Sequence, residues 1–160
     1  MSKAVKTNAM RQLDAAKIAY TVCGYAVDEN DLSAGHIAKE IGLPEGQVFK
    51  TIVCHGDKTG YLVFCIPADR EIHMKKAAAV TGNKKIEAVH VRDLLGLTGY
   101  IRGGCSPVGM KKKFPTFFDE SAREWEQITV SAGVRGMVLL LNTADIVRFT
   151  DATVADVTGT

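Results

Sequence analysis

The segment GYIRGGCSPVGMKKK, residues 99–113, is the stretch around which the rest of the chain is organised. Four of its residues are glycine, which permits left-handed backbone conformations and leaves N–H groups uncovered by side chains. Pro107 fixes one φ angle, so the loop is expected to have a defined shape. By itself the segment is compatible with a receptor for an anionic, carbonyl-bearing ligand, or with an ordinary turn followed by solvated lysines.

Length and composition predict one globular domain over residues 1–160. A chain of 160 residues can bury a continuous core, and its 46% hydrophobic and 24% charged residues are ordinary for such a domain. The formal net charge is only +2, so the whole molecule is not a polycation. Any contact with nucleic acid must therefore come from a local basic patch.

Cysteine and histidine spacing argues against both a disulfide framework and a metal site. The four cysteines stand singly, and no Cys-x-x-Cys or His-x-x-x-His pair is present. Isolated thiols suit a reducing compartment. The first residues lack the apolar core of a signal peptide, and no apolar run is long enough to span a membrane. We therefore expect a cytoplasmic protein with no metal, no cofactor and no membrane contact.

Residues 48–66 predict a β-hairpin. Val48–His55 alternates in character, Gly56–Gly60 has turn composition, and Tyr61–Ile66 is apolar on both faces, so both of its sides should be covered. Lys50 has only apolar neighbours at the two-residue spacing. A lysine there either extends to water at a strand end or points into a polar pocket, and the strand pattern alone favours the first.

The remaining pattern predicts an α+β domain with a mixed, curved or barrel-like sheet and surrounding helices. A second glycine loop, residues 132–136, separates two of its strands. Periodicity, caps and breakers place the other elements as follows. We expect strands at 20–26, 84–89, 116–118, 128–131 and 137–141, helices at 3–19, 34–41, 72–80, 143–148 and 154–157, and helical turns at 91–95 and 121–126.

Two glycine loops can line one pocket with backbone N–H groups, which stabilise an oxyanion or hold a phosphate. Ser106 and Ser131 could add hydroxyl groups, and Lys50 and Arg135 could add positive charge. Cys105 lies in the first loop, but no histidine can be tied to it as a base, so a buried thiol is the better interpretation. Nothing in the sequence demands a covalent enzyme.

Three motifs taken in series carry a resemblance. Phe49-Lys50-Thr51, the segment Gly103–Gly109 with its following lysines, and the segment Ser131–Gly136 occur in an order and spacing that resemble the YbaK/EbsC family. These are free-standing aminoacyl-tRNA deacylases related to the editing domain of bacterial prolyl-tRNA synthetase. The resemblance covers residues 5–157 and implies the YbaK/prolyl-tRNA-synthetase-associated domain fold. It also implies removal of cysteine from tRNA(Pro), with Cys-tRNA(Cys) as a second candidate substrate.

The resemblance also implies roles for individual residues. Lys50 would face the pocket, reversing the interpretation from the strand alone, and would act with Gly103 and Gly104 at the ester. The partners implied are the acceptor end of a mischarged tRNA and, as a further candidate, prolyl-tRNA synthetase. Substrate contacts would come from Tyr25, Thr51, Ser106, Pro107, Gly109, Ser131, Gly133, Arg135 and Gly136, and tRNA contacts from Lys111, Lys112 and Lys113.

Family chemistry leaves the reaction and its substrate partly open. In cysteine-specific members the thiol of the substrate is thought to attack its own ester, and water attack is the alternative. This chain has Val138 where those relatives carry aspartate, and Ala34 where many carry an aromatic residue, so the amino acid is undecided. A non-catalytic tRNA- or nucleotide-binding module of the same fold remains the competing hypothesis. A role in the cell envelope rests only on the name given to some relatives.

Overall fold

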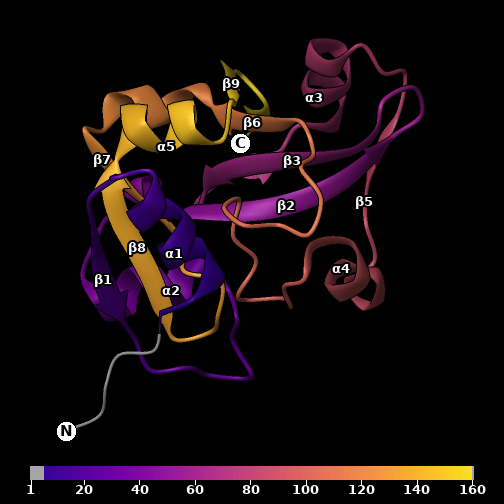
Figure 1. Ribbon diagram of the computed structural model, residues 1–160. Helices are drawn as coiled ribbons and strands as arrows, with labels where there is room; N and C mark the ends of the chain where they lie inside the picture. Colours follow the sequence, from indigo (N-terminus) through magenta and orange to yellow (C-terminus); the bar gives the residue numbers. More distant parts are fainter. Residues whose placement is uncertain (1–5, 160) are drawn as a thin grey trace, which may run out of the picture.

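The computed structural model describes residues 6–159 (Figure 1). Its helices are α1 (Asn8–Ala15), α2 (Ala34–Ile41), α3 (Met74–Thr81), α4 (Val91–Thr98) and α5 (Thr143–Phe149), with 3-10 turns η1 (Glu45–Gln47) and η2 (Glu120–Glu124). Its strands are β1 (Tyr20–Gly24), β2 (Phe49–Gly56), β3 (Gly60–Pro67), β4 (Glu71–Ile72), β5 (Ile86–Ala88), β6 (Thr116–Asp119), β7 (Gln127–Ser131), β8 (Met137–Asn142), β9 (Thr153–Ala155) and β10 (Thr158–Gly159). Among these residues, no helix is long and apolar enough to cross a membrane.

The strands form separate sheets instead of one closed barrel. A five-stranded sheet has the order β5-β2-β3-β6-β9, a three-stranded sheet the order β1-β8-β7, and β4 pairs with β10. Figure 1 shows the β2/β3 hairpin crossing the molecule beside the three-stranded sheet, with α5 above. Parallel pairing of β6 with β3 and β9 makes the larger sheet mixed. The predicted α+β class is confirmed, whereas a barrel-like sheet is not.

The predicted hairpin is present, and its second strand is buried on both faces. β2 and β3 pair antiparallel in a register that sets Lys50 opposite Ile66. Val63 and Cys65 belong to one hydrophobic cluster, and Leu62 and Phe64 belong to another on the opposite face of the strand. Strand β3 therefore separates two cores, which explains why its sequence shows no polar alternation.

Local capping explains where several helices begin and end. Ser33 accepts a hydrogen bond from the His36 N–H at the start of α2, and Gly42 ends that helix in the left-handed conformation. Helix α1 begins after its cap Thr7, later than expected, and residues 3–5 of the predicted helix lie outside the described residues. The predicted helical turn at 91–95 continues to Thr98 as α4.

The predicted helix at 154–157 is wrong. Thr153–Ala155 instead forms β9, parallel to β6, and Thr158–Gly159 forms β10. The buried carboxylate of Asp119 fixes this end of the chain, since it accepts hydrogen bonds from the Val157 N–H at 3.2 Å and the Thr158 hydroxyl at 3.1 Å. Tertiary pairing therefore outweighs the local pattern of two valines three residues apart. Likewise, the predicted helix at 72–80 begins only at Met74, because Glu71–Ile72 pairs with β10 as β4.

The two larger sheets meet at a seam where β2 begins. An isolated parallel bridge joins Val48 to Thr129 of β7. Val48 is fully buried, and Trp125 packs near Gly46 in the turn before it: a Cβ on that glycine would lie 3.5 Å from the indole ring. The seam carries the first residues of β2, including Lys50, to the end of the three-stranded sheet.

Candidate functional site

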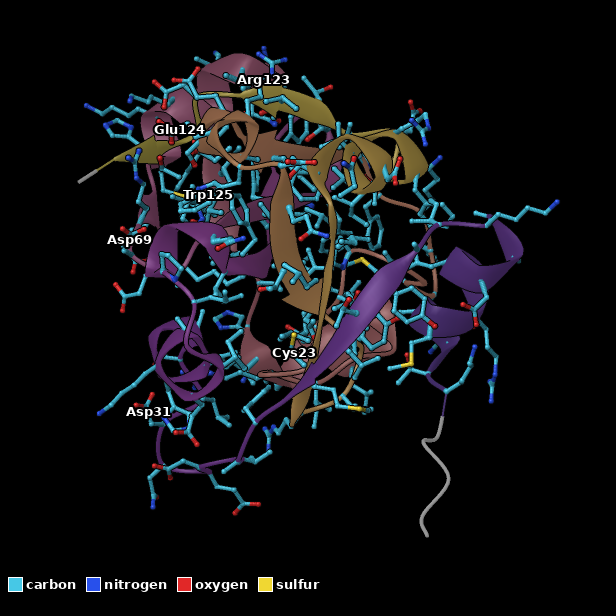
Figure 2. The ribbon with its side chains drawn as sticks, turned by 90° about the vertical axis from the view of Figure 1, so that its left-hand side faces the viewer. Cys23, Asp31, Asp69, Arg123, Glu124 and Trp125 are labelled. Carbon is cyan, nitrogen blue, oxygen red and sulfur yellow. The ribbon has the colours of Figure 1, made fainter. Side chains whose placement is uncertain are left out.

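A cavity of about 490 Å³ lies over this seam. Its walls come from segments far apart in the sequence: the start of α2, the start of β2, the loop before β4, the first glycine loop, and the ends of β7 and β8. Figure 2 views this side of the molecule, with Asp31 beside α2 and Cys23 on β1. The lining residues are Leu32, Ser33, Ala34, Gly35, Ile37, Val48, Phe49, Lys50, Thr51, Ile52, Ala68, Glu71, Arg102, Gly103, Cys105, Ser131 and Val138.

Lys50 points into this cavity. Its side chain is 24% exposed, and its ammonium Nζ lies 3.4 Å from both the Ala68 carbonyl oxygen and the Glu71 carboxylate Oε1. Both contacts are long for a charged hydrogen bond, so the ammonium group can exchange either acceptor for a better one. Lys50 thus lines the cavity near its mouth, at the second residue of its strand, where its ammonium group reaches the exposed Glu71 carboxylate.

The two glycine loops meet beside Lys50. A Cβ on Gly104 would lie 3.1 Å from the Val134 carbonyl carbon and 3.2 Å from the Arg135 nitrogen, so the two backbones are in close contact. Gly103 has a φ of +85°, and a Cβ there would lie 3.3 Å from Arg135 Nε. Only glycine permits both the approach and the conformation. The loops that the sequence singled out thus form one continuous structure.

Tyr100 packs against both glycine loops, a role that was not predicted from the sequence. Its hydroxyl donates a hydrogen bond to the Val108 carbonyl oxygen. A Cβ on Gly133 would lie 2.9 Å from Tyr100 Cε1, and one on Gly109 would lie 2.9 Å from the hydroxyl oxygen. Both glycines have positive φ. Their absent side chains make room for the aromatic ring that sets the spacing of the loops.

The predicted site residues divide into three groups. Lys50, Thr51, Gly103 and Ser131 line the cavity, while Gly104, Gly133 and Arg135 support its wall from behind. Ser131 Oγ accepts the Gly133 N–H at 3.1 Å, which leaves its own proton available. Tyr25 and Gly136 stand beside this wall, joined by a 2.9 Å hydrogen bond from the Tyr25 N–H to the Gly136 carbonyl oxygen, and neither lines the cavity.

The third group lies away from Lys50. Ser106 is fully buried and accepts the Val108 N–H at 3.2 Å, so its hydroxyl shapes the loop. Pro107, Gly109, Lys112 and Lys113 line a separate cavity of about 240 Å³. Lys111 is exposed.

No protein nucleophile is activated in the cavity. Cys105 is 8% exposed, and burial raises the pKa of its thiol to about 12, so it stays protonated at neutral pH. The described lining residues include no histidine to act as a base. Among residues 6–159, no cluster of His, Cys, Asp and Glu could hold a metal ion. The cavity offers an ammonium group and hydroxyl groups, whereas the N–H of Gly104, expected at the ester, donates to the Ile101 carbonyl oxygen at 3.0 Å.

Two charged lining residues, Arg102 and Glu71, were not predicted as site residues. Arg102 stands just before the glycine pair, and its carbonyl oxygen accepts a hydrogen bond from Arg135 Nε at 2.9 Å. The position of Arg102 next to Gly103 in the sequence could have indicated that it belongs to the site. Glu71 comes from a two-residue strand with no pattern of its own. Val138, noted for its departure from relatives, is 3% exposed and forms part of the apolar wall.

Comparison with known proteins places this chain among aminoacyl-tRNA editing proteins. Residues 28–149 match the model of the aminoacyl-tRNA editing domain family. The chain is 46% identical over 153 residues to EbsC of Enterococcus faecalis, which is named as a Cys-tRNA(Pro)/Cys-tRNA(Cys) deacylase; the match covers 96% of this chain and 93% of that protein.

Solved structures share the fold. One, described as a trans-editing enzyme for prolyl-tRNA synthetase, has a TM-score of 0.82 at 21% identity, and the match covers 98% of this chain and all of that one. Another, a hypothetical protein, has a TM-score of 0.86 at 19% identity, with 96% and 100% covered.

Proposed function

Because the chain belongs to the aminoacyl-tRNA editing domain family, we propose that it is a trans-editing deacylase that removes cysteine from mischarged tRNA(Pro). Cys-tRNA(Cys), which also stands in the name of the Enterococcus faecalis relative, is the second substrate to test. The observation that carries the proposal is the position of Lys50, which directs an ammonium group into a cavity lined by the first glycine loop, with the second loop packed behind that wall.

The cavity suits an ester at the 3′ end of tRNA. The Lys50 ammonium supplies positive charge for the terminal phosphate or the ester carbonyl. The same ammonium group and the Ser131 hydroxyl can donate hydrogen bonds to the oxyanion that forms when the carbonyl is attacked. Preorganised donors of this kind accelerate acyl transfer without a side-chain nucleophile.

The attacking group then comes from the substrate or from water. In the first case the cysteine sulfur bonds to the ester carbonyl carbon, the carbon–oxygen bond to the ribose breaks, and the thiol proton passes to the leaving ribose oxygen. The product is a cyclic thiolactone and a free tRNA 3′ end. An intramolecular attack gains a large effective molarity once the conformer is held. The neutral Cys105 thiol suits this route, since it cannot compete as a nucleophile.

The test is release of amino acid from Cys-tRNA(Pro), with the product identified by mass spectrometry. Lys50→Ala should abolish release, whereas Lys58→Ala, which removes an exposed lysine from the turn of the same hairpin, should not. Full activity of Lys50→Ala would remove this ammonium from the mechanism. Alanyl- and seryl-tRNA(Pro) in the same assay define the amino-acid preference, and a thiolactone product distinguishes cyclisation from hydrolysis.

The competing function, tRNA binding without turnover, draws on the exposed Lys111, Lys112 and Lys113. Each phosphate contact by a lysine adds about 0.7–0.9 to the slope of log K against log salt. Replacing all three lysines by alanine should therefore lower that slope if they contact tRNA. Binding of this kind with no release from any mischarged tRNA would favour the binding module. Added prolyl-tRNA synthetase tests whether a synthetase partner is required.

A further inference from the structure

The substrate of an aminoacyl-tRNA deacylase carries a positive charge on its amino group, and none of the residue roles given above provides a negative charge to bind it. Besides phosphates and an ester, an aminoacyl-tRNA presents a free α-amino group, which carries a positive charge when it is protonated. Lys50 and Arg102 are positively charged and would repel it. Among the described residues that line the cavity, Glu71 alone bears a carboxylate.

Glu71 is placed to exchange partners. Its side chain is 84% exposed, and its Oε1 is 3.4 Å from Lys50 Nζ, which is long for a charged hydrogen bond. An ion pair this exposed is weak, so either member can leave it for a better partner. Strand β4 nevertheless fixes the Glu71 backbone at the cavity, because it pairs with Gly159 of β10.

We propose that Glu71 binds the α-ammonium group of the aminoacyl ester. This inference rests on the proposed function and adds one substrate contact to it. The carboxylate exchanges one ammonium group, that of Lys50, for another, that of the substrate. The exchange frees Lys50 for the phosphate or the carbonyl at the moment when the ester arrives. The protein thereby selects an aminoacyl ester whose amino group is free and rejects one whose amino group is blocked.

The experiment compares Cys-tRNA(Pro) with N-acetyl-Cys-tRNA(Pro), which lacks the positive charge, at pH 6.5. The quantity measured is the ratio of kcat/KM for the free ester to kcat/KM for the acetylated ester. Acetylation changes the intrinsic reactivity of the ester equally for every protein variant, so a change in the ratio reports recognition of the charge. Glu71→Gln should lower the ratio by about tenfold, the loss expected for one charged hydrogen bond.

Asp69→Asn is the matched control. Asp69 is an exposed carboxylate two residues earlier, seen at the edge of the molecule in Figure 2, and it does not line the cavity. Asp69→Asn removes one carboxylate charge, as Glu71→Gln does, and its ratio of kcat/KM for the free ester to that for the acetylated ester should equal the wild-type ratio.

Three outcomes separate the ideas. A ratio lowered in Glu71→Gln but not in Asp69→Asn supports the proposal. An equal ratio in the wild type and Glu71→Gln overturns it, even while both release cysteine. If the wild type releases nothing from either ester, the proposed function itself has failed.

Discussion

Arg135 Nε donates a hydrogen bond to the carbonyl oxygen of Arg102 at 2.9 Å and thereby joins the second glycine loop to the first. The two residues are 33 positions apart, and the bond fixes the guanidinium beside Gly103. This bond thus adds to the Tyr100 ring and the close backbone contact that hold the two loops together behind the cavity.

Arg135→Lys should lower kcat/KM for release by about tenfold, because lysine keeps the charge but has no Nε donor at this position. The measurement is steady-state release from Cys-tRNA(Pro). Arg123→Lys, a change at an exposed arginine that does not line the cavity, serves as the control and should leave kcat/KM unchanged. Wild-type kinetics for Arg135→Lys would show that the bond is dispensable.

Gly104→Ala should reduce the free energy of unfolding by about 1–3 kcal/mol, since its Cβ would press on the Val134 and Arg135 backbone, which cannot move aside. Gly96→Ala is the opposite case. Gly96 lies within α4 with no atom within 4 Å of a Cβ, so alanine should stabilise by about 0.5–1 kcal/mol. Urea denaturation measures both. Equal stability of the two variants would contradict the close contact of the loops.

Thr129→Val should raise stability by about 1 kcal/mol. The Thr129 hydroxyl oxygen is buried at the seam and has no hydrogen-bond partner, so valine removes a desolvated polar group and keeps the shape. Thr143→Val should instead lower stability by about 1 kcal/mol, because the Thr143 hydroxyl donates to the Trp125 carbonyl oxygen at 2.7 Å. Thermal and urea unfolding of the two variants test whether the stability changes have these opposite signs.

Stability should fall as pH rises above about 9. Burial raises the pKa of Cys54 and of Cys105 from 9.0 to about 12, so these thiols stay protonated in the folded state where the unfolded chain has lost the protons. The stabilisation is complete below pH 9 and is lost as the pH approaches 12, at about 1.4 kcal/mol per pH unit for each thiol.

Urea denaturation between pH 8 and 10.5 measures this slope. Cys105→Ala should reduce it by the share of one thiol and should retain release of cysteine, because the neutral thiol takes no part in the reaction. Loss of release in a folded Cys105→Ala protein would contradict that assignment.

The sequence supports prediction where a residue type has one physical explanation. Gly42 after an amphipathic run marks the end of α2, and the apolar run of β3 indicates burial on both faces. It fails where the partner is distant. Nothing near Val154 shows that Asp119 and β6 will draw it into a strand, and nothing near Glu71 places it against Lys50. The sequence could predict that the two glycine loops come together, but it could not predict that Tyr100 packs between them.

The seam at Val48 and Thr129 also bears on how this architecture can diversify. Lys50 is held by the ladder of β2 with β3, and Val138 by the ladder of β8 with β1 and β7. A substitution at Val138, in the apolar wall of the cavity, therefore leaves intact the β2–β3 pairing that positions Lys50. Substitutions in this wall can thus alter the size and polarity of the cavity while Lys50 keeps its position.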